Sequence, residues 1–465
     1  MPDRGPYDLA IIGAGSSGFS AAITAGELGA RVALIGYGTI GGTCVSVPSK
    51  NVIRATEALH HAAAATRFGG IRAEARVEDW RAVELGKDAL VSSLRQAKYI
   101  DLLPAYDAVA YFEGRARLSD GGVAVNGSVL KADKVIITTG ASPALPPIPG
   151  IERVPYLTST TALELDRLPR SLLVIGGGYI GCELGQMFAR AGVIVTIVDI
   201  VPILSAGEPE ISTALAGYLR EEGIVLREGV RPTAIRETAR GVALDILADG
   251  RGETIEAEQV LVSTGRRPNT AGLGLEEAGI ELLANGGVKV DDYMRTTRGG
   301  TYAAGDVTGR DQFVYMAAYG ARIAAQNALN GDRQRYDTTA MPSIVFTDPQ
   351  VASVGLTEAQ ARAQGLAVKT SVLPLDQVPR ALAACDTRGL FKLVAEAGSG
   401  KLLGAHLLAP EGADSIQTAA LAIKGGLTAE ELAETIFPYL TTVEGLKLAA
   451  QSFAKDVAKL SCCAG

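Results

Sequence analysis

The chain has 465 residues, of which 47% are hydrophobic and 20% charged, so it can form about three domains with packed cores and is not a disordered protein. Its net charge of −7 and its lack of basic clusters or runs of like charge exclude the pattern of a nucleic-acid-binding protein. Five cysteines and three histidines exclude a disulfide scaffold and argue against a zinc site built from histidines.

The first feature of the chain is an uncharged stretch, residues 9–26. It contains four glycines and has no basic run before its apolar part, so it fits a buried strand, a turn and a helix better than a membrane span or a signal peptide. We therefore expect a soluble, cytoplasmic protein that associates neither with a membrane nor with nucleic acid.

This stretch predicts a dinucleotide-binding βαβ unit. A strand over 8–12 leads into Gly13-Ala-Gly15-Ser-Ser-Gly18, and a helix to about residue 28 precedes a second strand over 31–35. In this pattern the first glycine permits the tight turn, the second lets the backbone approach the pyrophosphate, and the third lets the helix pack on the strand.

The same pattern recurs further along the chain. A strand over 172–175 leads into Gly176-Gly177-Gly178-Tyr179-Ile180-Gly181, followed by a helix to about residue 191 and a strand over 193–198. One such glycine run is a weak signal, but two in the right context predict two bound dinucleotides.

An acidic residue that binds the ribose is expected at the end of the second strand of each unit. Eighteen residues after Gly181 stands Asp199, whereas the same count from Gly18 reaches Gly36. Asp199 would accept hydrogen bonds from an NAD ribose and repel the 2′-phosphate of NADP, and no Lys or Arg follows before Arg220. The sequence thus favours NADH over NADPH without deciding between them.

Three further strands end in short turn motifs: Thr139-Gly140, Thr264-Gly265 and Gly305-Asp306. With the two glycine runs, they resemble the FAD-dependent pyridine nucleotide–disulfide oxidoreductase family from about residue 8 to the C-terminus. The resemblance implies that FAD and NADH or NADPH are the cofactors, and that Asp306 holds the ribityl chain of FAD.

The resemblance also implies an α/β layout with two Rossmann-like domains and an α+β C-terminal domain. The FAD-binding domain would comprise 1–148 and 268–337, and the NAD(P)-binding domain 149–267. The third domain, 338–465, would form a homodimer whose active site is shared between the subunits.

The run Gly41-Gly42-Thr43-Cys44 lies where the family has its redox-active disulfide, with Gly42 and Thr43 next to the FAD. In the family, four residues and a second cysteine separate Cys44 from Val-Pro-Ser-Lys. Here that motif, ending in Lys50, begins three residues early and no second cysteine exists. Removing three residues rotates a helix start by about 300°, so Cys44 and Lys50 cannot both keep their family positions without rearrangement. The shortening is natural, engineered, or a loss of three residues from the sequence given; the sequence leaves these open.

Lys50 and Glu183 match family positions that form an ion pair beside the flavin, and Tyr179 matches a residue that covers the flavin until the nicotinamide arrives. A tyrosine packed in the core is the competing interpretation of Tyr179. Two other cysteines, Cys182 and Cys385, are expected to be structural.

Disulfide reductases of the family carry a His-Glu pair near the C-terminus that moves a proton to the thiols. In this chain the corresponding residues are Tyr439 and Glu444, and the chain ends in Cys462-Cys463-Ala-Gly. This combination resembles the branch of the family that reduces Hg(II) to Hg(0) for mercury detoxification. Cys462 and Cys463 would capture the metal and pass it to Cys44, since thiolates bind soft metal ions.

Two alternatives stay open because the second redox cysteine is missing. One is a flavoprotein that needs no disulfide, such as a pyridine nucleotide transhydrogenase or diaphorase. The other is a non-catalytic protein that binds metal through its thiols.

Overall fold

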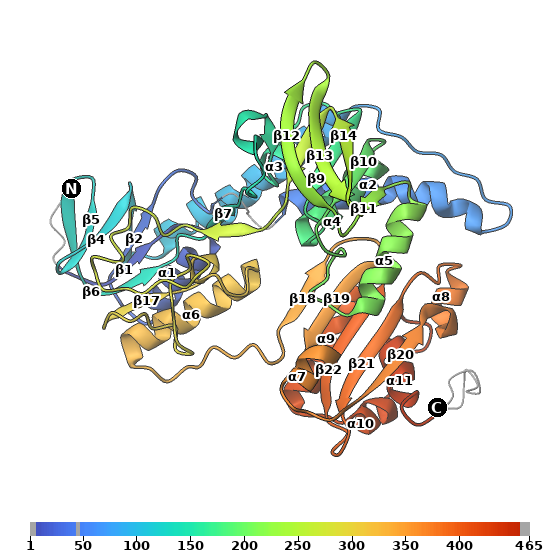
Figure 1. The fold of residues 1–465 in the computed structure, drawn as a ribbon. Coiled ribbons are helices and arrows are strands. Elements are labelled where there is room, and N and C mark those ends of the chain that lie inside the picture. Colours follow the sequence, from blue (N-terminus) through green and yellow to red (C-terminus); the bar gives the residue numbers. More distant parts are fainter. Residues whose placement is uncertain (1–5, 43–46, 456–465) are drawn as a thin grey trace. The chain divides into compact units, whose positions relative to one another are not determined.

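The structure is a computed structural model that describes residues 6–42 and 47–455. The chain forms two compact units, each assembled from three separate stretches of sequence (Figure 1). The first unit comprises 1–48, 84–144 and 265–337, and the second comprises 49–83, 145–264 and 338–465.

The first unit is built on a seven-stranded sheet in the order β3-β2-β1-β6-β5-β4, with β17 also paired to β6. Strands β3, β2, β1, β6 and β17 pair in parallel, whereas β4, β5 and β6 pair antiparallel. Helices α1 and α6 pack against each other, and β7 and β16 form a separate two-stranded sheet. The elements are β1 (Tyr7–Ile12), α1 (Ser16–Glu27), β2 (Val32–Gly36), β3 (Val109–Glu113), β4 (Ala116–Ser119), β5 (Gly122–Val125), β6 (Ser128–Ile137), β7 (Ala141–Pro143), β16 (Arg266–Pro268), β17 (Thr301–Ala303) and α6 (Val314–Asn330).

The second unit contains a parallel five-stranded sheet in the order β11-β10-β9-β15-β8 and an antiparallel sheet β12-β13-β14. The neighbouring strands β9 and β15 are short apolar runs buried on both faces, as expected where helices cover a parallel sheet. The elements are β8 (Tyr156–Leu157), β9 (Ser171–Ile175), α4 (Tyr179–Arg190), β10 (Ile194–Val198), α5 (Pro209–Glu221), β11 (Val225–Arg227), β12 (Arg231–Thr238), β13 (Gly241–Ala248), β14 (Arg251–Ala257) and β15 (Gln259–Val262).

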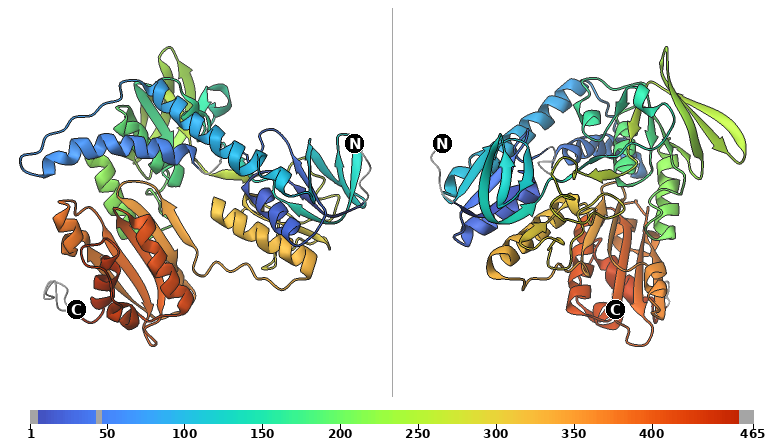
Figure 2. Two further views of the ribbon diagram at one scale, coloured as in Figure 1. Left: turned by 180° about the vertical axis from the view of Figure 1, so that it is seen from behind. Right: turned by 60° about the vertical axis from the view of Figure 1, so that its left-hand side comes forward.

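The C-terminal part of the second unit is an antiparallel sheet in the order β18-β19-β22-β21-β20. Helix α9 packs on β19 and β22 and helix α11 on β20 and β21, on the face that Figure 2 shows from behind. The elements are β18 (Pro342–Val345), β19 (Gln350–Gly355), α7 (Glu358–Ala363), β20 (Val368–Pro374), α8 (Pro379–Ala383), β21 (Leu390–Glu396), β22 (Leu402–Ala409), α9 (Gly412–Gly425), α10 (Ala429–Glu434) and α11 (Glu444–Gln451).

Two long helices complete the chain: α2 (Pro48–Ala64), which begins with a proline as many helices do, and α3 (Trp80–Arg95). Within residues 6–42 and 47–455, no helix has the length and apolar character needed to cross a membrane.

The α/β fold class with two nucleotide-type sheets and an α+β C-terminal part is confirmed. Each strand of the two predicted βαβ units begins and ends within one residue of its expected position. The predicted domain boundaries stay a prediction. Residues 49–83, which we expected in the FAD-binding domain, fold with the second unit.

A buried cluster of charges in the second unit joins the C-terminal sheet to the starts of α5 and α7. Lys392, on β21, is 2% exposed, and its Nζ donates hydrogen bonds of 2.8 Å to Glu208 and Glu210 and lies 3.1 Å from Glu358. These carboxylates raise the pKa of Lys392 although burial opposes them. A buried ammonium is tolerated here because it is fully paired.

Two histidines lie beside charged side chains, His406 buried and His60 half-buried. The His60 ring nitrogens lie 3.9 Å from Glu222 and from Asp348, and His406 Nδ1 has no hydrogen-bond partner among the described residues. Burial lowers the pKa of both histidines, and Arg190 lowers that of His60 further while its carboxylate neighbours oppose. Both side chains are therefore held in the neutral form in the folded protein.

In the unfolded chain, histidine side chains take up protons near pH 6.5, whereas in the folded protein these two stay neutral at that pH. The free energy of unfolding should therefore fall as the pH drops below about 6.5. We expect His60→Asn and His406→Asn each to flatten the dependence of Tm on pH between about pH 7.5 and 5.5. Scanning calorimetry measures this, with His61→Asn, at an exposed position, as the matched control. Equal slopes in all four proteins would contradict the assignment.

Candidate functional site

In the loop after β1, the backbone has open space next to the second glycine of the motif but is closely packed at the first and third. A Cβ atom on Gly13, where φ is +120°, would lie 2.3 Å from the Thr138 carbonyl oxygen, and one on Gly18 would lie 1.8 Å from the Gly13 oxygen. A Cβ on Gly15 would meet nothing within 4 Å. The first and third glycines thus allow close packing, while the second borders open space, as a bound pyrophosphate requires.

The loop after β9 repeats this geometry. A Cβ on Gly176 would lie 2.6 Å from the Ser263 oxygen, and one on Gly181 would lie 1.9 Å from the Gly176 oxygen. A Cβ on Gly178 would again meet nothing within 4 Å. The two loops are therefore physically equivalent although they lie in different units.

Each of the two loops leads into a helix whose first N–H groups are not capped by a side chain. Helices α1 and α4 have glycine at the N-cap, no side chain that caps the first N–H groups, and no acidic residue in the first turn. Such an end offers N–H donors and the positive end of the helix dipole to a phosphate. The residues present in both loops thus fit a dinucleotide.

Asp199 follows the end of β10, where the ribose carboxylate was predicted. Its Oδ2 accepts a 2.6 Å hydrogen bond from the Gly177 N–H and its Oδ1 a 3.2 Å bond from the Val201 N–H. The next side chain, Ile200, is 67% exposed. Arg220, the first basic residue to follow, donates to Glu228.

The predicted FAD-binding residues of the first unit lie at the carboxyl ends of its strands. The Asp306 carboxylate lies 3.5 Å from Arg266, and burial raises its pKa while the arginine opposes. Thr139 Oγ1 donates a 2.7 Å hydrogen bond to the Asn269 oxygen. Gly42, Gly140 and Gly265 all have positive φ; Gly140 lies just after β6, Gly265 just after β15, and Gly42 in the loop that follows β2.

Lys50 and Glu183 come together in the second unit. The Lys50 Nζ donates a 2.5 Å hydrogen bond to Glu183 Oε2, which joins the start of α2 to α4. The other oxygen, Oε1, accepts a 2.9 Å bond from the Phe346 N–H. The predicted ion pair therefore exists despite the shortened sequence before Lys50.

Three further residues predicted for the site, Tyr179, Tyr439 and Glu444, lie at or near the start of a helix. Tyr179 is the first residue of α4 and is 40% exposed, so it is not a core tyrosine. Tyr439 is 52% exposed, whereas Glu444 at the start of α11 is 8% exposed and accepts a 3.2 Å bond from the Leu440 N–H. Burial raises the pKa of Glu444.

The four remaining site predictions, Thr43, Cys44, Cys462 and Cys463, lie outside the described residues. Cys182 is buried as expected, and burial raises the pKa of its thiol. Cys385, which was expected to be structural, is exposed and lies in the turn after α8 with φ +50°.

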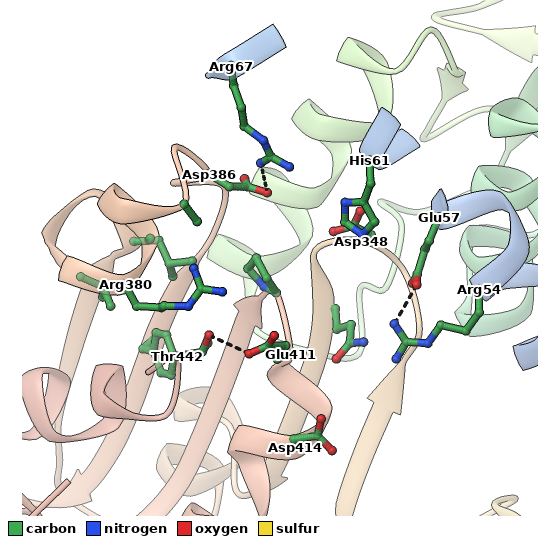
Figure 3. A pocket seen from close by; sticks show the side chains of 17 residues that line it. Arg54, Glu57, His61, Arg67, Asp348, Arg380, Asp386, Glu411, Asp414 and Thr442 are labelled. Atoms are coloured by element: carbon green, nitrogen blue, oxygen red, sulfur yellow. Dashed lines mark hydrogen bonds and ion pairs between the residues drawn. The ribbon is translucent and has the colours of Figure 1, made fainter. Parts of the chain in front are cut away.

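A cavity of about 250 Å³ opens in the second unit between α2, the segment 375–386 and the start of α9 (Figure 3). Its charged groups are largely paired, including Arg54 with Glu57 and Arg67 with Asp386, each at 2.7 Å. None of the site residues predicted from the sequence lines it. The cavity thus adds no support to the predicted chemistry.

Three contacts of the site were missed. Arg266 directly follows the Thr-Gly turn at Gly265 and Asn269 comes shortly after it, so their place beyond the carboxyl end of a strand was a usable signal. Phe346 follows a short strand and looks like a core residue, and nothing in the local sequence indicates its contact with Glu183.

Comparison with known proteins decides the family. The model of the pyridine nucleotide-disulphide oxidoreductase family matches residues 7–325, and that of the family's dimerisation domain matches 341–450. The chain belongs to this family. It therefore uses FAD and NAD(P)H and forms a homodimer.

Several curated relatives are similar over nearly the whole chain. Mercuric reductase from Staphylococcus aureus is 47% identical over 99% of this chain and 85% of its own length. Mercuric reductase from Streptomyces lividans is also 47% identical, over 99% of this chain and 98% of its own.

Among solved structures, the HOCl-induced flavoprotein disulfide reductase RclA from Escherichia coli matches with a TM-score of 0.84 and 30% identity, over 97% of this chain and 100% of its own. LpdA from Mycobacterium tuberculosis matches with a TM-score of 0.85 and 29% identity, over 96% of this chain and 99% of its own.

Gly178→Ala tests the nucleotide loop. Because the added methyl group meets open space, Tm should not change, whereas KM for NAD(P)H should rise about tenfold, or ~1.4 kcal/mol, since the methyl takes the place of the pyrophosphate. Gly217→Ala, inside α5 and also in open space, is the control and should leave KM unchanged. An unchanged KM in Gly178→Ala would contradict the site.

The surroundings of Asp199 predict a preference for NADH. We expect kcat/KM to be about tenfold higher with NADH than with NADPH, since the carboxylate repels the 2′-phosphate and Arg220, the first basic residue to follow it, is paired with Glu228. Ile200→Arg should reduce the ratio, while Ile194→Arg, exposed at the other end of β10, should not. A wild-type preference for NADPH would refute this prediction.

Proposed function

We propose that this chain is a mercury(II) reductase, which uses the two electrons of NAD(P)H to convert Hg(II) to volatile Hg(0) for mercury detoxification. The observation that carries the proposal is the 47% identity to mercuric reductases along nearly the whole chain. FAD, when bound, accepts the hydride of NAD(P)H and supplies two electrons to the metal ion.

The two glycine loops bind the two dinucleotides. In the first unit Gly13, Gly15, Gly18 and the start of α1 hold the FAD pyrophosphate, and Asp306 binds the ribityl chain. In the second unit Gly176, Gly178 and Gly181 hold NAD(P)H, whose ribose bonds to Asp199. Further FAD contacts come from Gly42, Thr43, Thr139, Gly140 and Gly265.

The Lys50–Glu183 pair keeps a positive charge available to the flavin. Glu183 is buried, and its two oxygens hold Lys50 and the Phe346 N–H, so the ammonium is both charged and oriented. Tyr179, at the end of the NAD(P)H loop, covers the flavin until the nicotinamide displaces it.

Hg(II) is passed from one set of cysteine thiolates to the next. Cys462 and Cys463 of one subunit capture the ion and transfer it to Cys44 of the other, so the active site is shared within the homodimer. Tyr439 stands in the place of the proton-shuttling histidine. A metal ion that passes between thiolates needs no proton shuttle, so a tyrosine can replace the histidine there.

The single inner thiol limits this route. Because no second cysteine stands between Cys44 and Lys50, two thiolates from this motif cannot bind Hg(II) at the flavin, and turnover should be slow. For the same reason the oxidised or reduced protein should show no thiolate–flavin charge-transfer band.

The test is anaerobic NADH oxidation with and without Hg(II), together with collection of Hg(0) vapour. We expect slow, Hg(II)-dependent oxidation that is lost in Cys44→Ser and in the Cys462→Ser/Cys463→Ser double variant. Cys385→Ser is the matched control, because this thiol is exposed but lies outside the route. Oxidation that is independent of Hg(II), or unchanged in Cys44→Ser, would refute the proposal.

A second candidate follows from the same missing cysteine, namely a pyridine nucleotide transhydrogenase or diaphorase, which needs no thiol. Rapid hydride exchange between NADH and an NADP analogue without Hg(II) would favour it. Hg(II) binding without NADH consumption would instead favour a non-catalytic metal binder.

A further inference from the structure

Phe346 contacts both members of the Lys50–Glu183 pair. It lies directly after β18, and its N–H donates the 2.9 Å hydrogen bond to Glu183 Oε1. The centroid of its ring lies 4.6 Å from the Lys50 Nζ. With the 2.5 Å bond between Lys50 and Glu183, the three residues form a closed triangle from three separate parts of the chain.

The two contacts of Phe346 do different work. The Glu183 side chain is 9% exposed, so its carboxylate needs hydrogen-bond donors. The backbone N–H of residue 346 satisfies one of its oxygens and would do so with any side chain at that position except proline. The Lys50 side chain is 36% exposed and sits on a flexible four-carbon stem. A carboxylate on one side and the face of an aromatic ring on the other restrict where the ammonium can lie.

We propose that the ring of Phe346 is a positioning element that holds the Lys50 ammonium in place for the flavin. Phe346 does not touch the reacting atoms in this account but acts through Lys50. The inference rests on the proposed function, in which Lys50 serves the bound FAD.

A side-chain substitution isolates the ring, because the N–H bond to Glu183 stays. Phe346→Leu removes the cation–π contact, and Phe346→Tyr keeps an aromatic face. A less restrained ammonium stabilises the negative charge of the reduced flavin less well. The midpoint potential of bound FAD should therefore become more negative and its reduction slower in Phe346→Leu.

The experiment is a double-mutant cycle on the FAD-loaded dimer, with Phe346→Leu in the wild-type and in the Lys50→Met background. The readouts are the midpoint potential, the anaerobic rate of flavin reduction by NADH, and Tm. We expect Phe346→Leu to slow reduction by about three- to tenfold and to shift the potential, and Phe346→Tyr to restore both. In Lys50→Met it should change neither.

Equal effects in both backgrounds, or a lower Tm with an unchanged potential, would overturn the proposal and leave Phe346 a packing residue. None of these readouts uses Hg(II). A protein that fails to release Hg(0) but shows the predicted cycle would therefore refute the proposed substrate and not the role of Phe346.

Discussion

The buried carboxylate of Glu183 is the constraint on which the second unit depends. A charged group that is 8% exposed is stable only if its oxygens are satisfied, and here one binds the Lys50 ammonium and the other a backbone N–H. Glu183 belongs to α4, the helix that follows the second glycine loop. Its two partners belong to α2 and to the chain after β18. One side chain thus fixes the start of α2 and the C-terminal sheet relative to α4.

The two glycine loops share one backbone geometry. In each, the backbone crosses so closely at the first and third glycines that a side chain would overlap a carbonyl oxygen, while the second glycine borders open space. The helix that follows has neither a capping side chain nor an acidic first turn. Because no side chain of the described residues caps them, the first N–H groups of the helix are available to a phosphate. Leaving them uncapped lowers the stability of the folded protein unless a cofactor is bound.

The sequence predicted those features that depend on local spacing. The strands, the glycine turns and Asp199 follow from short-range pattern, and the structure reproduces them within a residue. The Lys50–Glu183 pair, 133 residues apart, was available only through resemblance to the family. Phe346 was not predicted, because its partner Glu183 lies 163 residues away and a phenylalanine after a strand is indistinguishable from a core residue. The exposure of Cys385, in a turn with positive φ, was not predicted, because the neighbouring residues carry no signal for it.

The central claim is that electrons pass from a nicotinamide through bound FAD to Hg(II), and a half-reaction tests it most directly. The FAD-loaded dimer is reduced anaerobically with a stoichiometric amount of NADH and then mixed with Hg(II) while the flavin absorbance is followed. The account predicts that the flavin is reoxidised and that Hg(0) is released in an amount equal to the NADH consumed. A flavin that stays reduced in the presence of bound Hg(II) would contradict it.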